Sequence, residues 1–184
     1  MVWLVVDQSA TSETAPQPGG DYGMWTGHRV PEDRAAWNPL VLQFYDYWRT
    51  IAPAGALPGR QHLVIEHIAP LWSRLFLLDV FREPLRYRYR LCGTKLVDSL
   101  GEEVTGRWLD EVHPQLVANP ESRDRYRFVV ETGGATWRRG PPLWTCDPDH
   151  RMLESCIVPL AADGRTVDKI LAIVVVFDAD GIPV

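Results

Sequence analysis

The sequence lacks the features that mark several large classes of protein. Its three cysteines, Cys92, Cys146 and Cys156, are an odd number without CxxC spacing, so neither a disulfide framework nor a zinc site is indicated. No apolar run approaches the ~20 residues that a membrane-spanning helix needs. The apolar start of the chain, residues 2–6, has no basic segment of the kind that opens a signal peptide. We therefore expect a cytoplasmic protein.

Surplus positive charge and catalytic motifs are also missing. The net charge is -5, which argues against a nucleic-acid partner, because phosphate contacts need a clustered positive face. The chain has no HExxH, G-x-S-x-G or GxxxxGK[ST] motif. We expect no enzymatic activity. A small enzyme with an unrecognised site is the rival reading, and it predicts ionisable groups clustered inside a cavity.

The chain is long enough for one domain with a sizeable core. Its 184 residues include 46% hydrophobic and 23% charged residues, a composition typical of a globular domain that buries about 70% of its unfolded surface. Residues 1–37 are rich in Ser, Thr, Pro and Gly and predict an irregular N-terminal arm. Residues 38–57 predict an amphipathic helix and linker, and residues 58–184 the main domain.

The predicted helix in residues 38–57 starts with Asn38-Pro39, a capping residue followed by a residue suited to the first helical turn. Its apolar face must be covered, either by the sheet of its own chain or by a second chain. We favour a homodimer. The predicted interface consists of the apolar residues at helical spacing, Leu40, Phe44, Tyr47, Trp48 and Ile51.

The remaining pattern predicts an α+β fold, with strands at both ends and short helices between them. Residues 75–80 form a buried apolar run, and residues 85–91 alternate between arginines and the apolar or aromatic residues Tyr87, Tyr89 and Leu91. Alternation is the period of a strand, so these three side chains are expected inward and the arginines outward. Helices are predicted at 94–100, 108–112 and 120–132, followed by strands around Trp144, at 152–160 and at 169–177. The result is an antiparallel sheet with helices on one face.

Several short motifs between residues 40 and 178 are shared with a known family. They are Tyr47-Trp48-Arg49, Pro58-Gly59-Arg60, the FLLDV strand, the YRYRLCGT run from Tyr87 to Thr94, Gly101, Thr105-Gly106-Arg107, Tyr126, Val158-Pro159-Leu160 and Asp163-Gly164. With these motifs the chain resembles the PAS domain family, and more closely a bacterial subfamily of stand-alone PAS proteins of largely unassigned role. The resemblance implies a five-stranded antiparallel sheet whose helices enclose a cavity, and a sensory role in which a bound small molecule alters contacts with a partner.

The resemblance places Tyr89 and Leu91 of the alternating strand on the cavity side of the sheet. Plain core packing is the alternative for these residues, because buried aromatic side chains often only fill volume. A buried hydroxyl nevertheless needs a hydrogen-bond partner, which a ligand can supply. The candidate ligand-binding residues are Tyr87, Tyr89, Leu91, Trp108, Phe128, Trp144 and Met152.

Cofactor and partner expectations follow from the same resemblance. Some PAS domains hold haem, and His113 is the candidate ligand for that alternative, but no second motif supports it and we expect no cofactor. Cys92 precedes Gly-Thr rather than lying in an Asn-Cys-Arg helix motif, so flavin photochemistry is not indicated. We expect an unidentified small apolar or aromatic ligand and a separate effector protein. The rival is an interaction or dimerisation module that binds no ligand.

Overall fold

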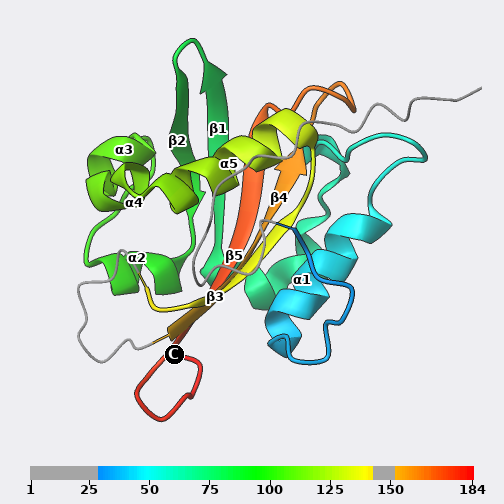
Figure 1. Ribbon diagram of the computed structural model, residues 1–184. Coiled ribbons are helices and arrows are strands. Elements are labelled where there is room, and N and C mark those ends of the chain that lie inside the picture. Colours follow the sequence, from blue (N-terminus) through cyan, green and yellow to red (C-terminus); the bar gives the residue numbers. More distant parts are fainter. Residues whose placement is uncertain (1–28, 143–151) are drawn as a thin grey trace, which may run out of the picture.

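The computed structural model describes residues 29–142 and 152–184. A five-stranded antiparallel sheet of order β2-β1-β5-β4-β3 forms its centre (Figure 1). The strands are β1 (Leu75–Arg82), β2 (Leu85–Cys92), β3 (Thr136–Gly140), β4 (Met152–Leu160) and β5 (Lys169–Phe177). The sheet and its helices confirm the predicted α+β fold. The strand expected around Trp144 falls outside the described residues, and β3 precedes that segment.

Helices precede β1 and also occupy the sequence between β2 and β3. The helical elements are α1 (Pro39–Thr50), the 3-10 helices η1 (Arg60–His62) and η2 (Ile65–Arg74), α2 (Thr94–Leu100), α3 (Leu109–Val112), α4 (Pro114–Ala118) and α5 (Pro120–Thr132). Asn38 and Asn119 cap α1 and α5 through their side-chain oxygens, each with proline at the first helical position. Both predicted helix starts are thus confirmed. In the described part of the chain, no helix has the length and apolarity to cross a bilayer.

The sheet separates two apolar cores, because β4 and β5 are buried on both faces. Successive residues of β5 alternate between the two cores. The inner core lies under α2 to α5 and includes Tyr89, Leu96, Leu109, Leu116, Tyr126, Val129, Ile157, Ile170 and Val174. The outer core lies under α1 and η2 and includes Val41, Phe44, Ile68, Leu71, Val158, Leu171, Ile173 and Val175. Figure 1 shows α2, α3 and α4 beside β2, with α1 at the other end of the sheet.

Helix α1 packs on the sheet of its own chain. Phe44 has no exposed surface in a single chain, and the Trp48 indole Nε1 donates a hydrogen bond of 2.9 Å to the Pro159 carbonyl in β4. The buried Glu154 carboxylate accepts hydrogen bonds from the Asn38 amide at 2.8 Å and from the Trp137 indole at 3.0 Å. The start of α1 is therefore fixed to β4 and β3. The homodimer stays a prediction, and in this packing Phe44 has no surface to offer a second chain.

A β-bulge at Arg90 interrupts the alternation of β2. Tyr89 pairs with Leu78, but Leu91 pairs with Leu77, so Arg90 is an extra residue. Tyr87 and Tyr89 therefore face the inner core, as predicted, while Leu91 packs against the outer core. The expectation that Leu91 points inward with the tyrosines is wrong, because one inserted residue reverses the side on which every later side chain lies.

The close approach of Gly93 to the end of η2 explains part of the Cys-Gly-Thr motif. Its amide donates to the Leu75 carbonyl at 2.8 Å. A Cβ at this position would lie 2.5 Å from the backbone carbonyl of Ser73. Glycine is required here by the lack of room for a side chain, which fixes where β2 ends and α2 begins.

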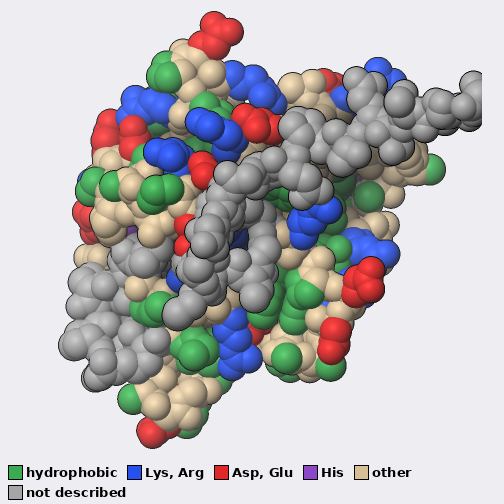
Figure 2. Space-filling model, in the orientation of Figure 1, with side chains coloured by type: hydrophobic (Ala, Val, Ile, Leu, Met, Phe, Trp, Pro, Cys, Tyr) green, Lys and Arg blue, Asp and Glu red, His purple; other side chains and the backbone are tan. Residues whose placement is uncertain are grey.

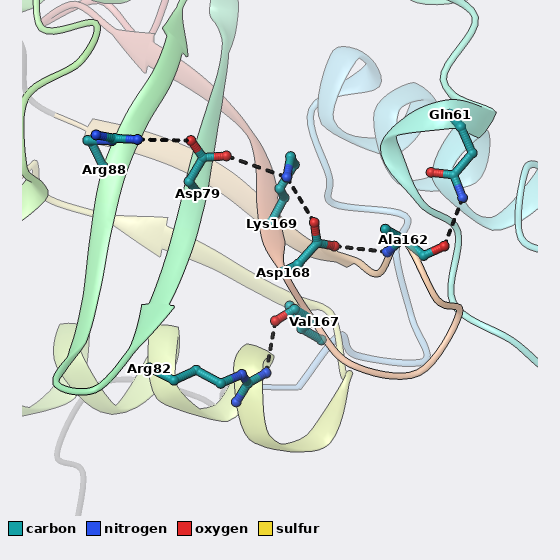
Figure 3. Close-up of polar contacts among 8 residues, drawn as sticks. All are labelled: Gln61, Asp79, Arg82, Arg88, Ala162, Val167, Asp168 and Lys169. Carbon is teal, nitrogen blue, oxygen red and sulfur yellow. Dashed lines mark hydrogen bonds and ion pairs between the residues drawn. The ribbon is translucent and has the colours of Figure 1, made fainter.

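Charged residues fasten three strands together on the outer face of the sheet, beyond α1. Asp79 in β1 lies 4.0 Å from the Arg88 guanidinium in β2 and 3.5 Å from the Lys169 ammonium in β5. Lys169 also contacts Asp168 at 2.8 Å, and Asp168 accepts from the Ala162 amide. Figure 3 shows this row of contacts running across the strands. The predicted outward stripe of arginines is therefore paired in part with acids of neighbouring strands.

Candidate functional site

A cavity of about 110 Å³ lies between β2 and the helices α3, α4 and α5. We call it the Tyr87 cavity. Pairing between β1 and β5 ends at Asp79, so the tip of the β1–β2 hairpin extends past β5, as Figure 1 shows. The cavity lies where this hairpin meets the short helices, and its lining residues are Leu85, Arg86, Tyr87, Leu109, Asp110, Leu116, Val117, Arg123, Tyr126 and Arg127.

Helix α5 is held over the sheet by a buried arginine. The Arg125 guanidinium donates to the hydroxyls of Thr136 at 2.9 Å and Ser155 at 3.0 Å, and to the Ser155 carbonyl at 3.1 Å. These contacts fix the rotation of α5. Burial lowers the pKa of Arg125 to about 10, so the side chain stays charged at neutral pH. With Arg125 fixed on β3 and β4, Arg123, Tyr126 and Arg127 face the Tyr87 cavity.

Tyr87 contributes a buried hydroxyl to the site. Its oxygen has no hydrogen-bond partner among the described residues, and its ring lies 5.4 Å from the ring of Tyr126. Burial, chiefly, raises the pKa of Tyr87 above its usual value, with the Tyr126 hydroxyl adding to the effect. The hydroxyl is therefore protonated at neutral pH. It can donate one hydrogen bond and accept another, and residues 29–142 and 152–184 supply neither.

A second, smaller cavity of about 20 Å³ lies deeper under α2 and α4. Here the Tyr89 hydroxyl lies 3.0 Å from His113 Nε2. Burial lowers the pKa of His113 to about 4, so the imidazole is neutral at pH 7. The volume is that of about one water molecule. Leu116 and Tyr126 line both cavities. The empty space is therefore larger beside Tyr87 than beside Tyr89, where side chains nearly fill it.

The surroundings of His113 do not fit a haem. Its Nε2 atom is engaged by Tyr89, and about 20 Å³ of space next to it does not admit a porphyrin. No cluster of three or more metal-ligating side chains occurs in residues 29–142 and 152–184. Cys92 and Cys156, the cysteines that the structure describes, are both free thiols whose pKa is raised to about 12 by burial.

Four charged residues form what we call the cavity mouth: Arg86, Asp110, Arg123 and Arg127. All four line the Tyr87 cavity; Arg123 and Arg127 are exposed, and Arg86 and Asp110 are half-buried. Arg86 and Asp110 form a two-point ion pair with distances of 3.0 and 2.9 Å. The hydrogen bond from Arg86 lowers the pKa of Asp110. Figure 2 shows basic side chains gathered where the β1–β2 hairpin meets the helices.

Comparison with known proteins agrees with this architecture. The family model described as "PAS domain" matches residues 38–135, more than half of the chain. The chain belongs to the PAS domain family. No curated protein matches it. The match covers α1 to α5 with β1 and β2, and in this PAS domain β3, β4 and β5 complete the sheet beyond the matched residues. Family and fold together indicate a domain of the sensory and signalling type.

The structure of the PAS domain separates the predicted ligand-binding residues. Tyr87 lines the larger cavity and Tyr89 the smaller one. Phe128 packs at the edge of the inner core but lines neither cavity. Leu91 faces the outer core, Met152 is 39% exposed at the start of β4, and Trp144 lies outside the described residues. Their ligand-binding roles stay predictions.

Trp108 lies outside both cavities, against the hairpin. It follows the Gly106–Arg107 segment, which pairs with the free edge of β2 through Tyr89. Its ring is 4.9 Å from Phe81 and 4.1 Å from the Arg86 guanidinium. Trp108 therefore faces away from the inner core, and it positions Arg86 by a cation–π contact.

Sequence reasoning missed most of the cavity lining. The lining residues outside the prediction are Leu85, Arg86, Leu109, Asp110, Leu116, Val117, Arg123, Tyr126 and Arg127. Leu116 and Val117 belong to α4, a helix that the sequence signals by Pro114 at its first position. Arg123, Tyr126 and Arg127 have the three- and four-residue spacing of one helix face. That spacing was the available signal for a polar and aromatic wall.

Proposed function

We propose that this PAS domain is a sensor that binds a small apolar or aromatic molecule in the Tyr87 cavity and passes on its state through protein contacts. The observation that carries the proposal is the Tyr87 hydroxyl, which is buried and has no hydrogen-bond partner in the part of the chain that the structure describes. Leaving a buried hydroxyl unpaired costs about 1–3 kcal/mol. A ligand with one polar atom recovers this energy, whereas plain core packing does not.

The size and composition of the cavity define the ligand. Its volume is about 110 Å³, somewhat below the roughly 150 Å³ of an engineered apolar cavity that holds benzene. Leucine, valine and tyrosine side chains supply its inner walls. A molecule no larger than a single ring therefore fits inside, and a larger group must extend through the mouth. This excludes haem- or flavin-sized ligands at this place.

The short helices above the cavity supply the means of signalling. Helix α3 has four residues and α4 has five, and helices of this length depend on tertiary contacts rather than on their own stability. A ligand shifts an equilibrium only through its different affinities for two states. We therefore propose that occupancy changes how α3 and α4 pack on β2, and that an effector protein reads this surface.

No chemical step is part of the proposal. The tyrosine hydroxyl of the cavity is protonated, and Asp110 is engaged by Arg86, so neither is placed as a base within the inner walls. Clustered ionisable groups, which the enzyme alternative requires, are found at the solvent-exposed mouth. A cytoplasmic location remains part of the same proposal.

The test is a titration of the ¹⁵N-labelled protein with phenol, monitored by two-dimensional NMR. Phenol has one ring and one hydroxyl, which matches the cavity and Tyr87. We expect saturable shifts confined to β2, α3, α4 and α5. Val117→Trp fills the cavity and should abolish them. Val64→Trp, at a position that is 41% exposed and outside the cavity, is the control.

Two results decide against the sensor. Shifts that do not saturate, or that survive Val117→Trp unchanged, would show that the cavity takes no ligand. The interaction module without a ligand would then be the better explanation. Shifts limited to the lining residues, with no change in hydrogen exchange across α3 and α4, would support ligand binding in the cavity. They would contradict the proposal that α3 and α4 transmit the signal.

A further inference from the structure

The charges at the cavity mouth do not balance. Arg86, Arg123 and Arg127 face one acid, Asp110, among the residues that line the cavity. This local excess of positive charge stands against a net charge of -5 for the whole chain. A cavity with apolar walls and a positive mouth favours a ligand with an apolar body and a negative end.

Within the cavity mouth, Asp110 is paired with Arg86. Its two carboxylate oxygens accept from Arg86 Nε and Nη2 at 3.0 and 2.9 Å. Arg86 also contacts Glu111 at 3.2 Å and stacks on Trp108. Arg86 therefore has its charge matched by neighbouring acids, and the unmatched charge of the mouth belongs to Arg123 and Arg127.

Within the described ranges, the ion-pair partners of Arg123 and Arg127 are weak. The Arg123 guanidinium lies 3.6 Å from Asp124, and that of Arg127 lies 3.8 Å from Glu131. Both distances are longer than a normal N–H···O hydrogen bond. Exposed ion pairs of this kind contribute about 0–1 kcal/mol to stability. Both arginine side chains are about half exposed, at 51% and 52%. They can turn to a carboxylate at the mouth at little energetic cost.

The two arginines are one helical turn apart on α5, with Tyr126 between them. Residues four apart lie on one face of a helix, and both line the cavity. The Arg127 charge also acts on the Tyr87 hydroxyl, where it opposes the effect of burial on the pKa. Tyr87, Arg123 and Arg127 thus border one continuous path from the apolar interior to solvent.

We infer that the ligand of the Tyr87 cavity is a small aromatic monocarboxylate, whose ring lies among Leu116, Val117 and Tyr126 and whose carboxylate meets Arg123 and Arg127. The inference rests on the proposed function, because it specifies the molecule that the same cavity senses. A guanidinium binds a carboxylate through paired hydrogen bonds, and the tyrosine rings offer faces to an aromatic ring.

Benzoate and benzamide form the matched pair of probes, since they have nearly the same shape and differ in charge. Dissociation constants are measured by NMR titration at low ionic strength and again with added salt. We expect benzoate to bind at least tenfold more tightly than benzamide, and added salt to weaken benzoate alone. Val117→Trp should abolish the binding of both probes.

The double variant Arg123→Gln/Arg127→Gln tests the proposed contacts. It should reduce benzoate affinity to the level of benzamide and leave benzamide affinity unchanged. Arg60→Gln, at an exposed arginine outside the cavity, is the control and should change neither. Thermal unfolding and circular dichroism of each variant show whether it keeps its fold.

The outcomes separate this inference from the function on which it rests. If benzamide binds as tightly as benzoate and Val117→Trp abolishes the binding of both, the inference of a carboxylate ligand is wrong. The proposed sensor function would still hold. Benzoate binding that persists in the double variant would also overturn the inference. If neither probe binds, or if binding survives Val117→Trp, the proposed ligand cavity fails as well.

Discussion

The Tyr89 hydroxyl and His113 Nε2 lie 3.0 Å apart inside the inner core, so the imidazole of α4's N-terminus is tied to the central part of β2. His113 is 3% exposed. A histidine buried in this way resists protonation, because the charged ring would lose its hydration, and this effect outweighs the opposing charge of Glu102.

Acid should therefore destabilise the protein through His113. Its pKa is lowered from 6.5 to about 4 by burial. Between these values the unfolded chain binds a proton that the folded chain does not, so stability is full above pH 6.5 and falls as pH drops toward 4. From pH 7 to pH 5 the loss should be about 2 kcal/mol. Urea unfolding at both pH values measures it.

Two variants identify the source of the acid effect. His113→Gln should lose most of the difference between pH 7 and pH 5. His67→Gln removes an exposed histidine and should keep it. An unchanged pH dependence in His113→Gln would contradict the burial of a neutral imidazole.

Tyr87→Phe should stabilise the protein while it weakens ligand binding. The substitution removes a buried hydroxyl that has no partner, so the free energy of unfolding should rise by about 1 kcal/mol. Affinity for phenol should fall, because the ligand loses its hydrogen bond. Differential scanning calorimetry and the phenol titration give the two readouts.

Tyr47→Phe is the matched comparison for that experiment. The Tyr47 hydroxyl accepts from the Val64 amide at 2.7 Å, so its removal should lower stability and leave phenol binding intact. A stability loss in Tyr87→Phe like that of Tyr47→Phe would show that the Tyr87 hydroxyl has a protein partner.

Glu154→Leu should lower the free energy of unfolding by about 1–3 kcal/mol, since it leaves two part-buried N–H donors without this acceptor. The donors are the Asn38 amide and the Trp137 indole. Glu154→Gln keeps an acceptor oxygen and should cost less. Urea unfolding followed by tryptophan fluorescence measures both variants, and equal losses would mean that the hydrogen bonds contribute little.

Phe44→Ala should cost about 3–5 kcal/mol through the cavity it leaves. If α1 packs only within its own chain, this loss and the melting temperature are the same at every protein concentration. If α1 forms the predicted dimer interface, the melting temperature rises with concentration. Calorimetry over a hundredfold concentration range, with sedimentation equilibrium, distinguishes the two arrangements.

The strands β1, β2, β4 and β5 and the helices α1 and α5 followed directly from sequence patterns, whereas β3 did not. β4 and β5 have the predicted ranges, 152–160 and 169–177, and the Asn-Pro pairs at 38 and 119 start α1 and α5. These signals are local, because a cap or a run of β-branched residues acts within a few positions. The PAS resemblance added the expectation of a five-stranded antiparallel sheet, and the order of its strands came only from the structure.

The cavity was harder to predict, because its walls come from elements that meet only in three dimensions. Trp108 lies in the expected segment, yet it belongs to the strip that pairs with the edge of β2 and turns its ring to Arg86. Leu91 was misplaced by the bulge at Arg90. Neither the register of an edge strand nor a one-residue bulge leaves a clear signal in local hydrophobicity.

The bulge also makes the length of β2 intolerant of change. Loops elsewhere can gain or lose a residue, but removal of Arg90 would turn Leu91 toward the tyrosines and Cys92 toward α1. The same deletion would draw Gly93 out of the narrow space beside Ser73. The extra residue thus lets β2 supply side chains to the inner core before the bulge and to the outer core after it. The number of residues between Tyr89 and Gly93 therefore matters as much as their identity.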